Sequence, residues 1–356
     1  MTHIRVKDSI RRLHEDFVKR GEEDGKLIRL DRNENAFGHS KNVERALRHT
    51  SGALSSYPEL YADSLLHKLA DIHRISEQNI VAGNGSFELI TAISQSYLNP
   101  EDEVIIPTPT FDWYKTASLL AHGHIIEVPV ENHRISPDKI LQAVTAKTKI
   151  IWLCNPNNPT GTVLSEVELH RFLEKLSPEI LLVLDEAYID FIRETEPVNS
   201  IHIVRTHPNV ILLRTFSKVY GLASLRIGYA IGNAAVIEGI RNFKTPVSVN
   251  YLAIKAAVAS LDDEAFRRSV VRQTAKQLDY LYKEFNQLGL SYIRSNTNFL
   301  TVCVGRDSDY VVNELKKRKI LVRGGKDFGY PEWLRITVGK EEENQLVVTY
   351  LKDILS

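Results

Sequence analysis

Short runs of β-branched and aliphatic residues alternate through the middle of the chain with stretches whose apolar residues recur at helical spacing. The pattern predicts strands at Glu103–Pro107, Ile125–Val130, Lys149–Cys154, Ile180–Asp185, Val210–Arg214 and Arg226–Ile231. It predicts helices between them at Ser86–Leu98, Pro137–Ala146 and Ser165–Leu176. Such alternation is typical of an α/β fold with a mainly parallel, mixed sheet covered by helices, which binds ligands at the carboxyl ends of its strands.

The pattern changes after Asn250, where a long helical stretch reaches about Leu288. Beyond it, short strands are predicted between helices, around Phe299–Val304, Ile320–Val322 and Leu334–Val338. They indicate a second, smaller α+β domain, and the charged N-terminal arm is expected to pack on that domain or on a partner subunit. For 356 residues we predict an arm at 1–45, a large domain at 46–265 and a small domain at 266–356.

The composition excludes several classes of protein. Lys and Arg together number 45, as do Asp and Glu, so the formal net charge of zero predicts no nucleic-acid partner and no anionic membrane partner. The first residues are charged throughout, unlike a signal peptide, and no eighteen apolar residues run together. Cys154 and Cys303 lie in apolar runs typical of buried thiols, and no His or Cys pattern has metal-ligand spacing. We expect a cytoplasmic protein without a metal site or a disulfide framework.

Lys218 closes the run Leu213-Arg214-Thr215-Phe216-Ser217 and is followed by Arg226. A lysine amine becomes a nucleophile when its pKa is lowered, and it then condenses with an aldehyde. The hydroxyls of Thr215 and Ser217 and the guanidinium of Arg226 are groups that bind a phosphate. A Ser-Lys pair alone is common on protein surfaces, but an amine among phosphate-binding groups points to pyridoxal 5'-phosphate.

Two loops follow predicted strands. Gly83-Asn84-Gly85-Ser86 follows the strand-like Asn79–Ala82 and opens a helix, so its free N–H groups either hold a phosphate or form a plain tight turn. The second loop is Asn155-Pro156-Asn157-Asn158-Pro159-Thr160-Gly161, in which the prolines fix the backbone and aim the amide side chains. A structural turn explains the prolines but not, as economically, the three asparagines.

Asp185 closes the apolar run Ile180–Leu184, where a carboxylate needs a charged or hydrogen-bonded partner. A protonated pyridine nitrogen is such a partner, and Asp185 would keep that ring cationic, while Tyr188 would hydrogen-bond its phenolic oxygen. The alternative is that Asp185 caps the following helix. Arg323 and Arg335 are candidates for binding a carboxylate or phosphate, or for structural ion pairs.

With these residues in chain order, the sequence resembles the fold-type I pyridoxal-phosphate aminotransferases, and it is most similar to their histidinol-phosphate aminotransferase branch. The likeness covers roughly residues 30 to 338. Its motifs are Asn33-Glu34-Asn35, Tyr57-Pro58, Gly83-Asn84-Gly85-Ser86, Asn157-Asn158-Pro159-Thr160-Gly161, Asp185-Glu186-Ala187-Tyr188, Thr215-Phe216-Ser217-Lys218, Gly221-Leu222-Ala223, Leu225-Arg226-Ile227-Gly228 and Leu334-Arg335-Ile336-Thr337-Val338-Gly339. Their ordered co-occurrence carries the resemblance.

The resemblance implies a role for each candidate site residue. The catalytic residues are Lys218, which condenses with the cofactor, Asp185, which pairs with its pyridine nitrogen, and Tyr188. The implied cofactor contacts are Asn158 and Tyr188 at the phenolic oxygen, Phe111 on the ring face, and Gly85, Ser86, Thr215, Ser217, Arg226 and Tyr57 at the phosphate. The implied substrate contacts are Arg335, which anchors the anionic group, Arg323, Asn158 and Tyr57. Tyr57 would reach the cofactor of a neighbouring subunit, which implies a homodimer with shared active sites.

The implied activity is ping-pong transamination between a small-molecule amino donor, histidinol phosphate, and a 2-oxo acid acceptor, 2-oxoglutarate, a step of histidine biosynthesis. Three alternatives stay open: an aromatic or other amino-acid aminotransferase, a threonine-phosphate decarboxylase-like enzyme, and an inactive cofactor-binding paralogue. Two departures from the family bear on the substrate. Phe87 stands where family members usually carry Asp, and no Tyr-x-Pro-Gly segment occurs between Met1 and Leu30.

Overall fold

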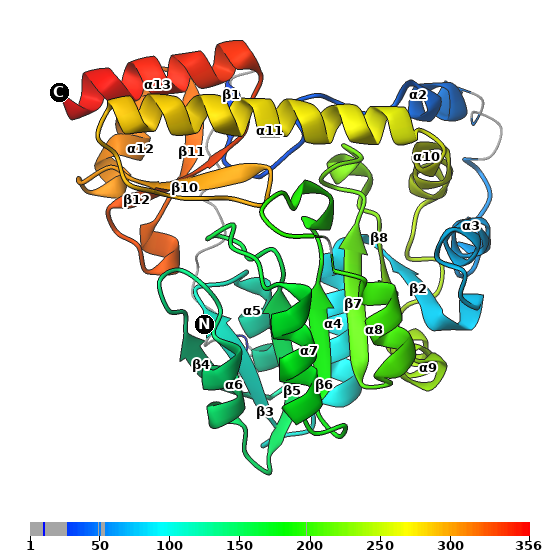
Figure 1. Cartoon of the computed structure of the whole chain (residues 1–356). Helices are drawn as coiled ribbons and strands as arrows, with labels where there is room; N and C mark the ends of the chain where they lie inside the picture. The colour runs from blue at the N-terminus through cyan, green and yellow to red at the C-terminus, as the bar shows by residue number, and fades with distance from the viewer. Residues whose placement is uncertain (1–9, 11–26, 49, 51–53, 197) are drawn as a thin grey trace, which may run out of the picture.

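The computed structural model describes residue 10 and residues 27–356, except 49, 51–53 and 197. Most of the predicted arm therefore lies outside the described residues, as do the region examined for a signal peptide and nearly all of the segment examined for Tyr-x-Pro-Gly. The described chain forms two sheets, a large one and a small one, with helices packed against both (Figure 1).

The large sheet has the strand order β2-β8-β7-β6-β5-β3-β4. β8 runs antiparallel to both of its neighbours, whereas all the other pairs are parallel, so the predicted mixed, mainly parallel α/β fold is confirmed. Its central strands are buried on both faces, which explains their nearly continuous apolar sequence. The bounds are β2 (Ile80–Gly83), β3 (Glu103–Thr108), β4 (His124–Pro129), β5 (Thr148–Cys154), β6 (Leu181–Asp185), β7 (Val210–Thr215) and β8 (Gly228–Ile231).

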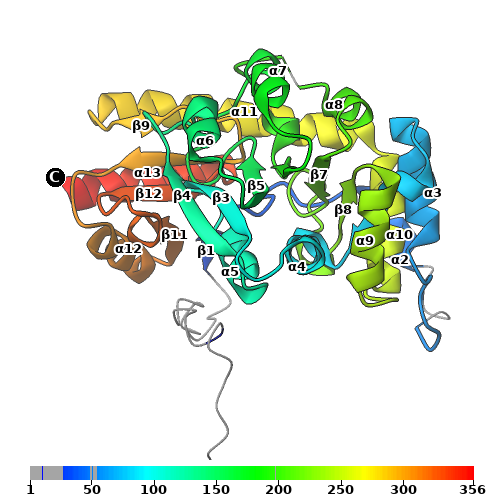
Figure 2. The ribbon, with the colours of Figure 1, turned by 90° about the horizontal axis from the view of Figure 1, so that it is seen from below.

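Helices cover both faces of this sheet (Figure 2). One face packs on α4 (Gly85–Tyr97), α5 (Trp113–Leu120) and α9 (Ala234–Phe243). The other face packs on α3 (Asp63–His73), α6 (Pro137–Ala143), α7 (Glu166–Lys175), α8 (Ser200–Thr206) and α10 (Tyr251–Leu261), and α2 (Lys41–Arg48) lies against α10. Local sequence fixes the ends of these helices; for example, Ser165 and Glu168 form a capping box at the start of α7.

The small sheet has the order β1-β11-β12-β10-β9. Its strands are β1 (Ile28–Leu30), β9 (Tyr292–Ile293), β10 (Phe299–Cys303), β11 (Ile320–Gly324) and β12 (Trp333–Thr337), and it packs with α11 (Glu264–Gln287), α12 (Ser308–Lys317) and α13 (Glu341–Leu355) around one apolar core. β1 pairs in parallel with β11, so the described part of the arm lies on the small sheet. The domain boundaries at 45/46 and 265/266 stay a prediction.

Two sequence predictions need correction. The single helical stretch from Asn250 to Leu288 is two helices, because α10 ends at Leu261 with Asp262 as its C-cap. Asp263 then caps the start of α11, its Oδ1 accepting from the Phe266 N–H at 3.0 Å. Arg226 does not begin a strand. Its φ of 55° is left-handed, and it follows a 3₁₀ turn, η3 (Ala223–Leu225), so β8 starts at Gly228. Three further 3₁₀ turns are η1 (Glu77–Asn79), η2 (Ile189–Phe191) and η4 (Lys326–Phe328). Within the described part of the chain, every helix is too short or too polar to cross a lipid bilayer.

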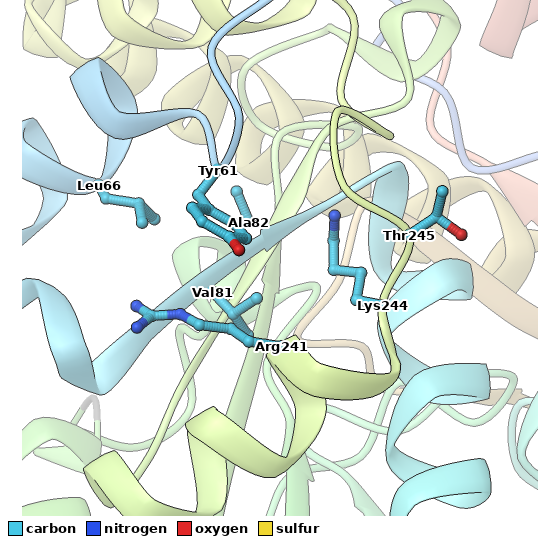
Figure 3. A pocket seen from close by; sticks show the side chains of 7 residues that line it. All are labelled: Tyr61, Leu66, Val81, Ala82, Arg241, Lys244 and Thr245. Atoms are coloured by element: carbon cyan, nitrogen blue, oxygen red, sulfur yellow. The ribbon is translucent and has the colours of Figure 1, made fainter.

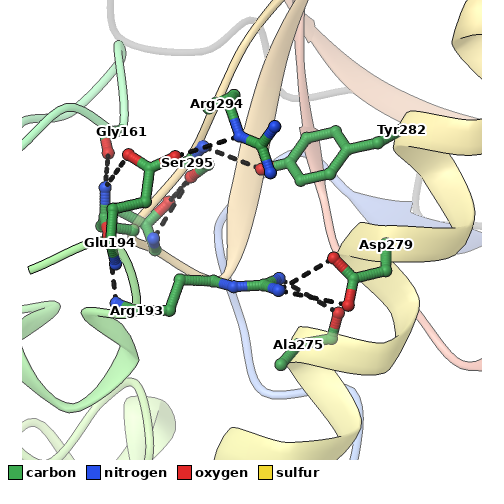
Figure 4. Close-up of polar contacts among 10 residues, drawn as sticks. Gly161, Arg193, Glu194, Ala275, Asp279, Tyr282, Arg294 and Ser295 are labelled. Carbon is green, nitrogen blue, oxygen red and sulfur yellow. Dashed lines mark hydrogen bonds and ion pairs between the residues drawn. The ribbon is translucent and has the colours of Figure 1, made fainter.

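Polar contacts link segments around the large sheet to segments around the small sheet (Figure 4). They lie beside the loop of residues 155–161, called the asparagine loop from here on. Arg193, just after η2, donates to both carboxylate oxygens of Asp279 on α11, at 2.8 and 3.1 Å. Glu194 pairs with Arg294 at 3.1 Å. The backbone N–H of Asn296 donates to the Gly161 carbonyl at 2.8 Å. The loop that carries Asn158 is therefore hydrogen-bonded directly to the segment that connects β9 and β10 of the small sheet.

Candidate active site

The candidate residues converge because neighbouring parallel strands end together. Cys154 of β5 is in register with Asp185 of β6, and Asp185 with Leu213 of β7. The loops that follow these strands, which carry Asn158 and Lys218, therefore leave the sheet at one edge, as expected for the ligand site of a parallel sheet.

Asp185 is 3% exposed, and both carboxylate oxygens accept hydrogen bonds from the protein. Oδ1 accepts from the Ala187 N–H at 3.0 Å, and Oδ2 accepts from the Tyr114 hydroxyl at 2.7 Å. Burial raises the pKa of Asp185 to about 6, while the Tyr114 hydrogen bond opposes that rise. Asp185 is followed by a 3₁₀ turn, η2, and not by an α-helix. The bond from the Ala187 N–H is therefore a local cap, and it leaves Oδ2 free for the Tyr114 hydroxyl.

Lys218 is half-buried beside the described end of the arm. Its Nζ donates to the carbonyl oxygens of Asn33 at 3.0 Å and Arg32 at 3.3 Å, and it lies 5.6 Å from the centroid of the Tyr188 ring. Burial, and then the charge of Arg335, lower the pKa of Lys218 to about 7. A large fraction of the amine is therefore neutral and nucleophilic near pH 7. Lys218 and Asp185 also lie within electrostatic reach of each other.

Gly85 and Arg226 form a cradle where α4 begins. Gly85 has a φ of +73°, and a Cβ there would come within 2.6 Å of Arg226 Nη2, so the guanidinium lies directly over the turn. Arg226 Nη1 donates to the Ala223 carbonyl at 2.8 Å, and the Thr215 hydroxyl donates to Ser217 at 2.9 Å. The backbone N of Ser86 lies close to the start of β8, 3.0 Å from where a Cβ of Gly228 would be. A cation, hydroxyls and a helix N-terminus therefore gather as a phosphate requires.

The three asparagines of the loop have different partners. Asn155 bonds to both polar groups of the Leu164 backbone, at 2.7 and 3.2 Å, and Asn157 is held by Thr110, Thr160 and the Pro109 carbonyl. These two are structural. Asn158 instead accepts from Arg335 Nη1 at 2.8 Å, so it alone of the three reaches the other candidate residues.

Arg335 and Arg323 lie opposite each other in the register of β11 and β12. Besides its bond to Asn158, Arg335 donates from Nη2 to the Asp31 carbonyl at 2.7 Å, while its Nε is buried without a partner among the described residues. Arg323 pairs with Asp327 at 2.7 Å, an ion pair of the kind that the structural alternative predicts, and its contact with a substrate stays a prediction. An orphaned, buried guanidinium N–H suits an anionic ligand.

Aromatic side chains line the site at the start of α5. Phe111 meets Phe87 edge to face at 5.3 Å and Tyr114 at 5.4 Å, and the guanidinium of Arg226 lies 5.9 Å from the Phe87 ring. Phe87 thus contacts Arg226 without offering it a carboxylate.

Two residues at the centre of the site were missed by sequence reasoning. Asn33, buried with a φ of 54°, donates to the Tyr188 hydroxyl at 2.9 Å, and its carbonyl accepts from Lys218. It was quoted in a motif, but nothing in the sequence indicated its contacts. Tyr114 was not singled out at all. Conversely, Tyr57 is 91% exposed, unlike the buried and half-buried residues of the cluster.

Two cavities of the described chain lie outside this cluster. One, of about 10 Å³, is drawn in Figure 3 and has room for a single water molecule at most. The other, of about 420 Å³, is lined by Phe37, Gln273, Lys276, Gln277, Lys340, Glu341 and Glu342. Neither includes Lys218, Asp185 or Arg335, so neither competes with the cluster as the reaction site.

Two solved structures share this architecture. Histidinol-phosphate aminotransferase from Sinorhizobium meliloti, solved in complex with pyridoxal-5'-phosphate, has a TM-score of 0.88 at 26% identity, covering 92% of this chain and 90% of that chain. L-threonine-O-3-phosphate decarboxylase from Porphyromonas gingivalis has a TM-score of 0.83 at 26% identity, covering 92% of this chain and 99% of that chain. The two-sheet fold, with its candidate site at the strand ends, places this chain in the same structural class as these two enzymes.

The sequence comparisons narrow this class to one family. The family described as aminotransferase class I and II matches residues 25–351. Histidinol-phosphate aminotransferase 2 of Carboxydothermus hydrogenoformans is 39% identical over 330 residues, which cover 92% of this chain and 91% of that protein. The chain belongs to the class I and II aminotransferases.

Proposed function

We propose that this chain is a pyridoxal-phosphate-dependent aminotransferase that takes its amino group from histidinol phosphate and passes it to 2-oxoglutarate, in histidine biosynthesis. The observation that carries the reaction class is a half-buried amine of near-neutral pKa, Lys218, within electrostatic reach of the buried carboxylate of Asp185. The name of the Carboxydothermus relative supports the donor. The location of this chain in the cytoplasm stays a prediction.

The residues present fit the cofactor. When bound, pyridoxal phosphate supplies an aldehyde and a cationic ring that draws electrons from the substrate Cα. Asp185 would hold the proton on the ring nitrogen, and Phe111 would cover a ring face. Asn158 and the Tyr188 hydroxyl would donate to the phenolic oxygen; burial raises the pKa of Tyr188, so this hydroxyl keeps its proton at neutral pH.

The phosphate would lie in the cradle at the start of α4. The N–H groups of Gly85 and Ser86, the hydroxyls of Thr215 and Ser217, and the Arg226 guanidinium would bind it. Because a Cβ at Gly85 would come within 2.6 Å of Arg226 Nη2, we infer that the guanidinium and the turn close on the phosphate together.

Lys218 would move the reacting proton. Its Nζ, neutral in a large fraction at pH 7, would take up the proton of the substrate Cα and carry it during the reaction. Arg335, assisted by Arg323 and Asn158, would hold the substrate's anionic group, which in histidinol phosphate is the phosphate. By holding that group, Arg335 would orient the substrate for loss of its Cα proton.

A homodimer with shared sites is the finer part of the proposal. Tyr57 lies on the loop between α2 and α3, and its 91% exposure is unusual for a large aromatic residue. Leu54, Leu60 and Tyr61 on the same loop are also exposed, which supports coverage of this loop by a second copy. Tyr57 would then reach the cofactor phosphate and the substrate of the partner subunit.

A second candidate is decarboxylation of a phosphorylated amino acid, favoured by the likeness to the Porphyromonas enzyme. The same residues would serve both reactions if the phosphate occupied Arg335 and left the carboxylate out of the ring plane. An inactive paralogue is disfavoured because Lys218, Asp185 and Arg226 are all present.

Single-turnover spectroscopy of the cofactor-loaded protein tests the donor. Histidinol phosphate is expected to convert the bound cofactor faster than histidine, phenylalanine or tyrosine, because it alone offers a phosphate to Arg335. Conversion by the free aromatic amino acids but not by histidinol phosphate would reject the donor and leave transamination standing. Release of carbon dioxide from threonine phosphate would favour the second candidate.

The pH dependence of cofactor loading tests the role of Lys218. Lysine reacts as the neutral amine, and with a pKa of about 7 rather than 10.5 that form is nearly complete by about pH 8. The rate at which apo-protein bonds pyridoxal phosphate, followed by stopped-flow absorbance, is therefore expected to rise through pH 7 and then level off. A rate that keeps rising towards pH 10 would show an ordinary lysine. Lys218→Ala, the matched control, should show no such phase.

A further inference from the structure

Tyr114 contacts two residues that would touch different parts of the proposed cofactor, Asp185 at the ring nitrogen and Phe111 at the ring face. It lies in α5, is 0% exposed, and donates its hydroxyl to Asp185 Oδ2 at 2.7 Å. Its ring stacks on Trp152 of β5, with centroids 4.9 Å apart and planes 7° apart, which fixes the side chain. Its ring also meets Phe111 edge to face at 5.4 Å.

We propose that Tyr114 is the positioning residue that keeps Asp185 ionised and aimed at the cofactor's ring nitrogen, while it supports Phe111 against the ring face. This inference rests on the proposed function, which brings the cofactor between Asp185 and Phe111. With donors on both oxygens, from Ala187 N–H and from Tyr114, the carboxylate is held in one orientation. A charge-assisted hydrogen bond of this kind is stronger than a neutral one.

The groups around Asp185 explain why a hydroxyl is needed there. Lys218 is cationic when protonated, Glu186 is anionic, and burial raises the pKa of the neighbouring Cys154 and Tyr188 so that they stay neutral. The Tyr114 hydrogen bond opposes the effect of burial on the pKa of Asp185 more strongly than the charge of Lys218 does. Without it, Asp185 would take up a proton more readily and lose its hold on a protonated ring nitrogen.

Tyr114→Phe removes the hydroxyl and keeps the ring stack. Titrating pyridoxal phosphate into apo-protein at pH 8 is expected to give a Kd about tenfold higher than for the parent, the loss expected for a hydrogen bond to a charged group. Tyr97→Phe is the matched control. Tyr97 donates to the Val236 carbonyl at 2.7 Å, at the far end of α4, so its removal should leave the Kd unchanged.

The pH dependence of apo-protein stability gives a second readout, which needs no cofactor. The folded pKa of Asp185, about 6, lies above its ordinary value of 3.8, so the protonated group stabilises the fold fully below pH 3.8 and this contribution is lost as the pH rises through 6. Tyr114→Phe raises that pKa further, so its deficit in Tm should be larger at pH 8 than at pH 5. Tyr97→Phe should lower Tm equally at both.

The double variant with Asp185→Asn decides between positioning and mere packing. On that background, Tyr114→Phe should lose the pH-dependent part of its deficit. If Tyr114→Phe fails to fold but the double variant folds, the unpaired carboxylate is the cause, which supports the proposal; if both fail, it is overturned. An unchanged Kd with a pH-independent deficit also overturns it. If the parent binds no pyridoxal phosphate, the proposed function fails, while the Tm comparison still tests the Tyr114–Asp185 link.

Discussion

Lys218→Ala is expected to lower kcat at least about 10⁴-fold, because the variant loses both the amine that bonds the cofactor and the base that moves the Cα proton. The fold should survive, since Lys218 is half-buried and its hydrogen bonds go to two backbone carbonyls of the arm. The measurement is steady-state turnover of donor and 2-oxo acid with saturating pyridoxal phosphate, beside a thermal melt.

Lys244→Ala is the matched control for a buried lysine outside the cluster. The Lys244 side chain is 9% exposed and its Nζ lies 3.6 Å from Glu88 Oε2, so its loss should lower Tm and leave kcat close to that of the parent. A Lys218→Ala protein that turns over like the parent would reject the reaction class. Partial recovery of that variant by an added small amine would support the role of Nζ as the base.

The position of the site could be predicted from the sequence because it depends on local features. Asp185 closes one apolar run, and Lys218 lies a few residues after another, residues 210–213. Both runs read as buried strands, and parallel strands present their carboxyl ends at one edge. The Gly85 turn is equally local, since the first turn of a helix leaves its N–H groups without intrahelical partners and glycine readily adopts the positive φ found there.

The partners of these residues could not be predicted, because they come from distant parts of the chain. Asp185 bonds to Tyr114, 71 residues earlier, and Tyr188 to Asn33, 155 residues earlier. The spacing of apolar residues along the chain does not indicate such pairs. The same holds for the asparagine loop. Asn155, Asn157 and Asn158 look equivalent in the sequence, and only their tertiary contacts show that their roles differ.

Asp185 and Glu186 show this limit most clearly, since they are adjacent, acidic and both 3% exposed. Glu186 pairs with Arg214 of β7 at 2.9 Å, whereas Asp185 bonds to Tyr114 and lies within reach of Lys218. Glu186 is thus a structural ion pair, and Asp185 is the carboxylate that the cofactor ring would meet.

Replacing each of the two carboxylates is therefore expected to have a different effect. Asp185→Ala should lower kcat about 10³-fold, the scale for removing a charge-stabilising group from an active site. Its stability above pH 6 should not fall by much, because the buried carboxylate costs stability there. Glu186→Gln should keep kcat but lose about 3 kcal/mol of unfolding free energy, since it strands Arg214.

Turnover with saturating pyridoxal phosphate and urea unfolding of the same two proteins, both at pH 8, separate these outcomes. If Glu186→Gln lost turnover while Asp185→Ala kept it, the assignment of the ring-nitrogen partner would be wrong. If both variants lost only stability, neither carboxylate would face the cofactor, and the cluster built on Lys218 would lack the anion that a cationic ring requires.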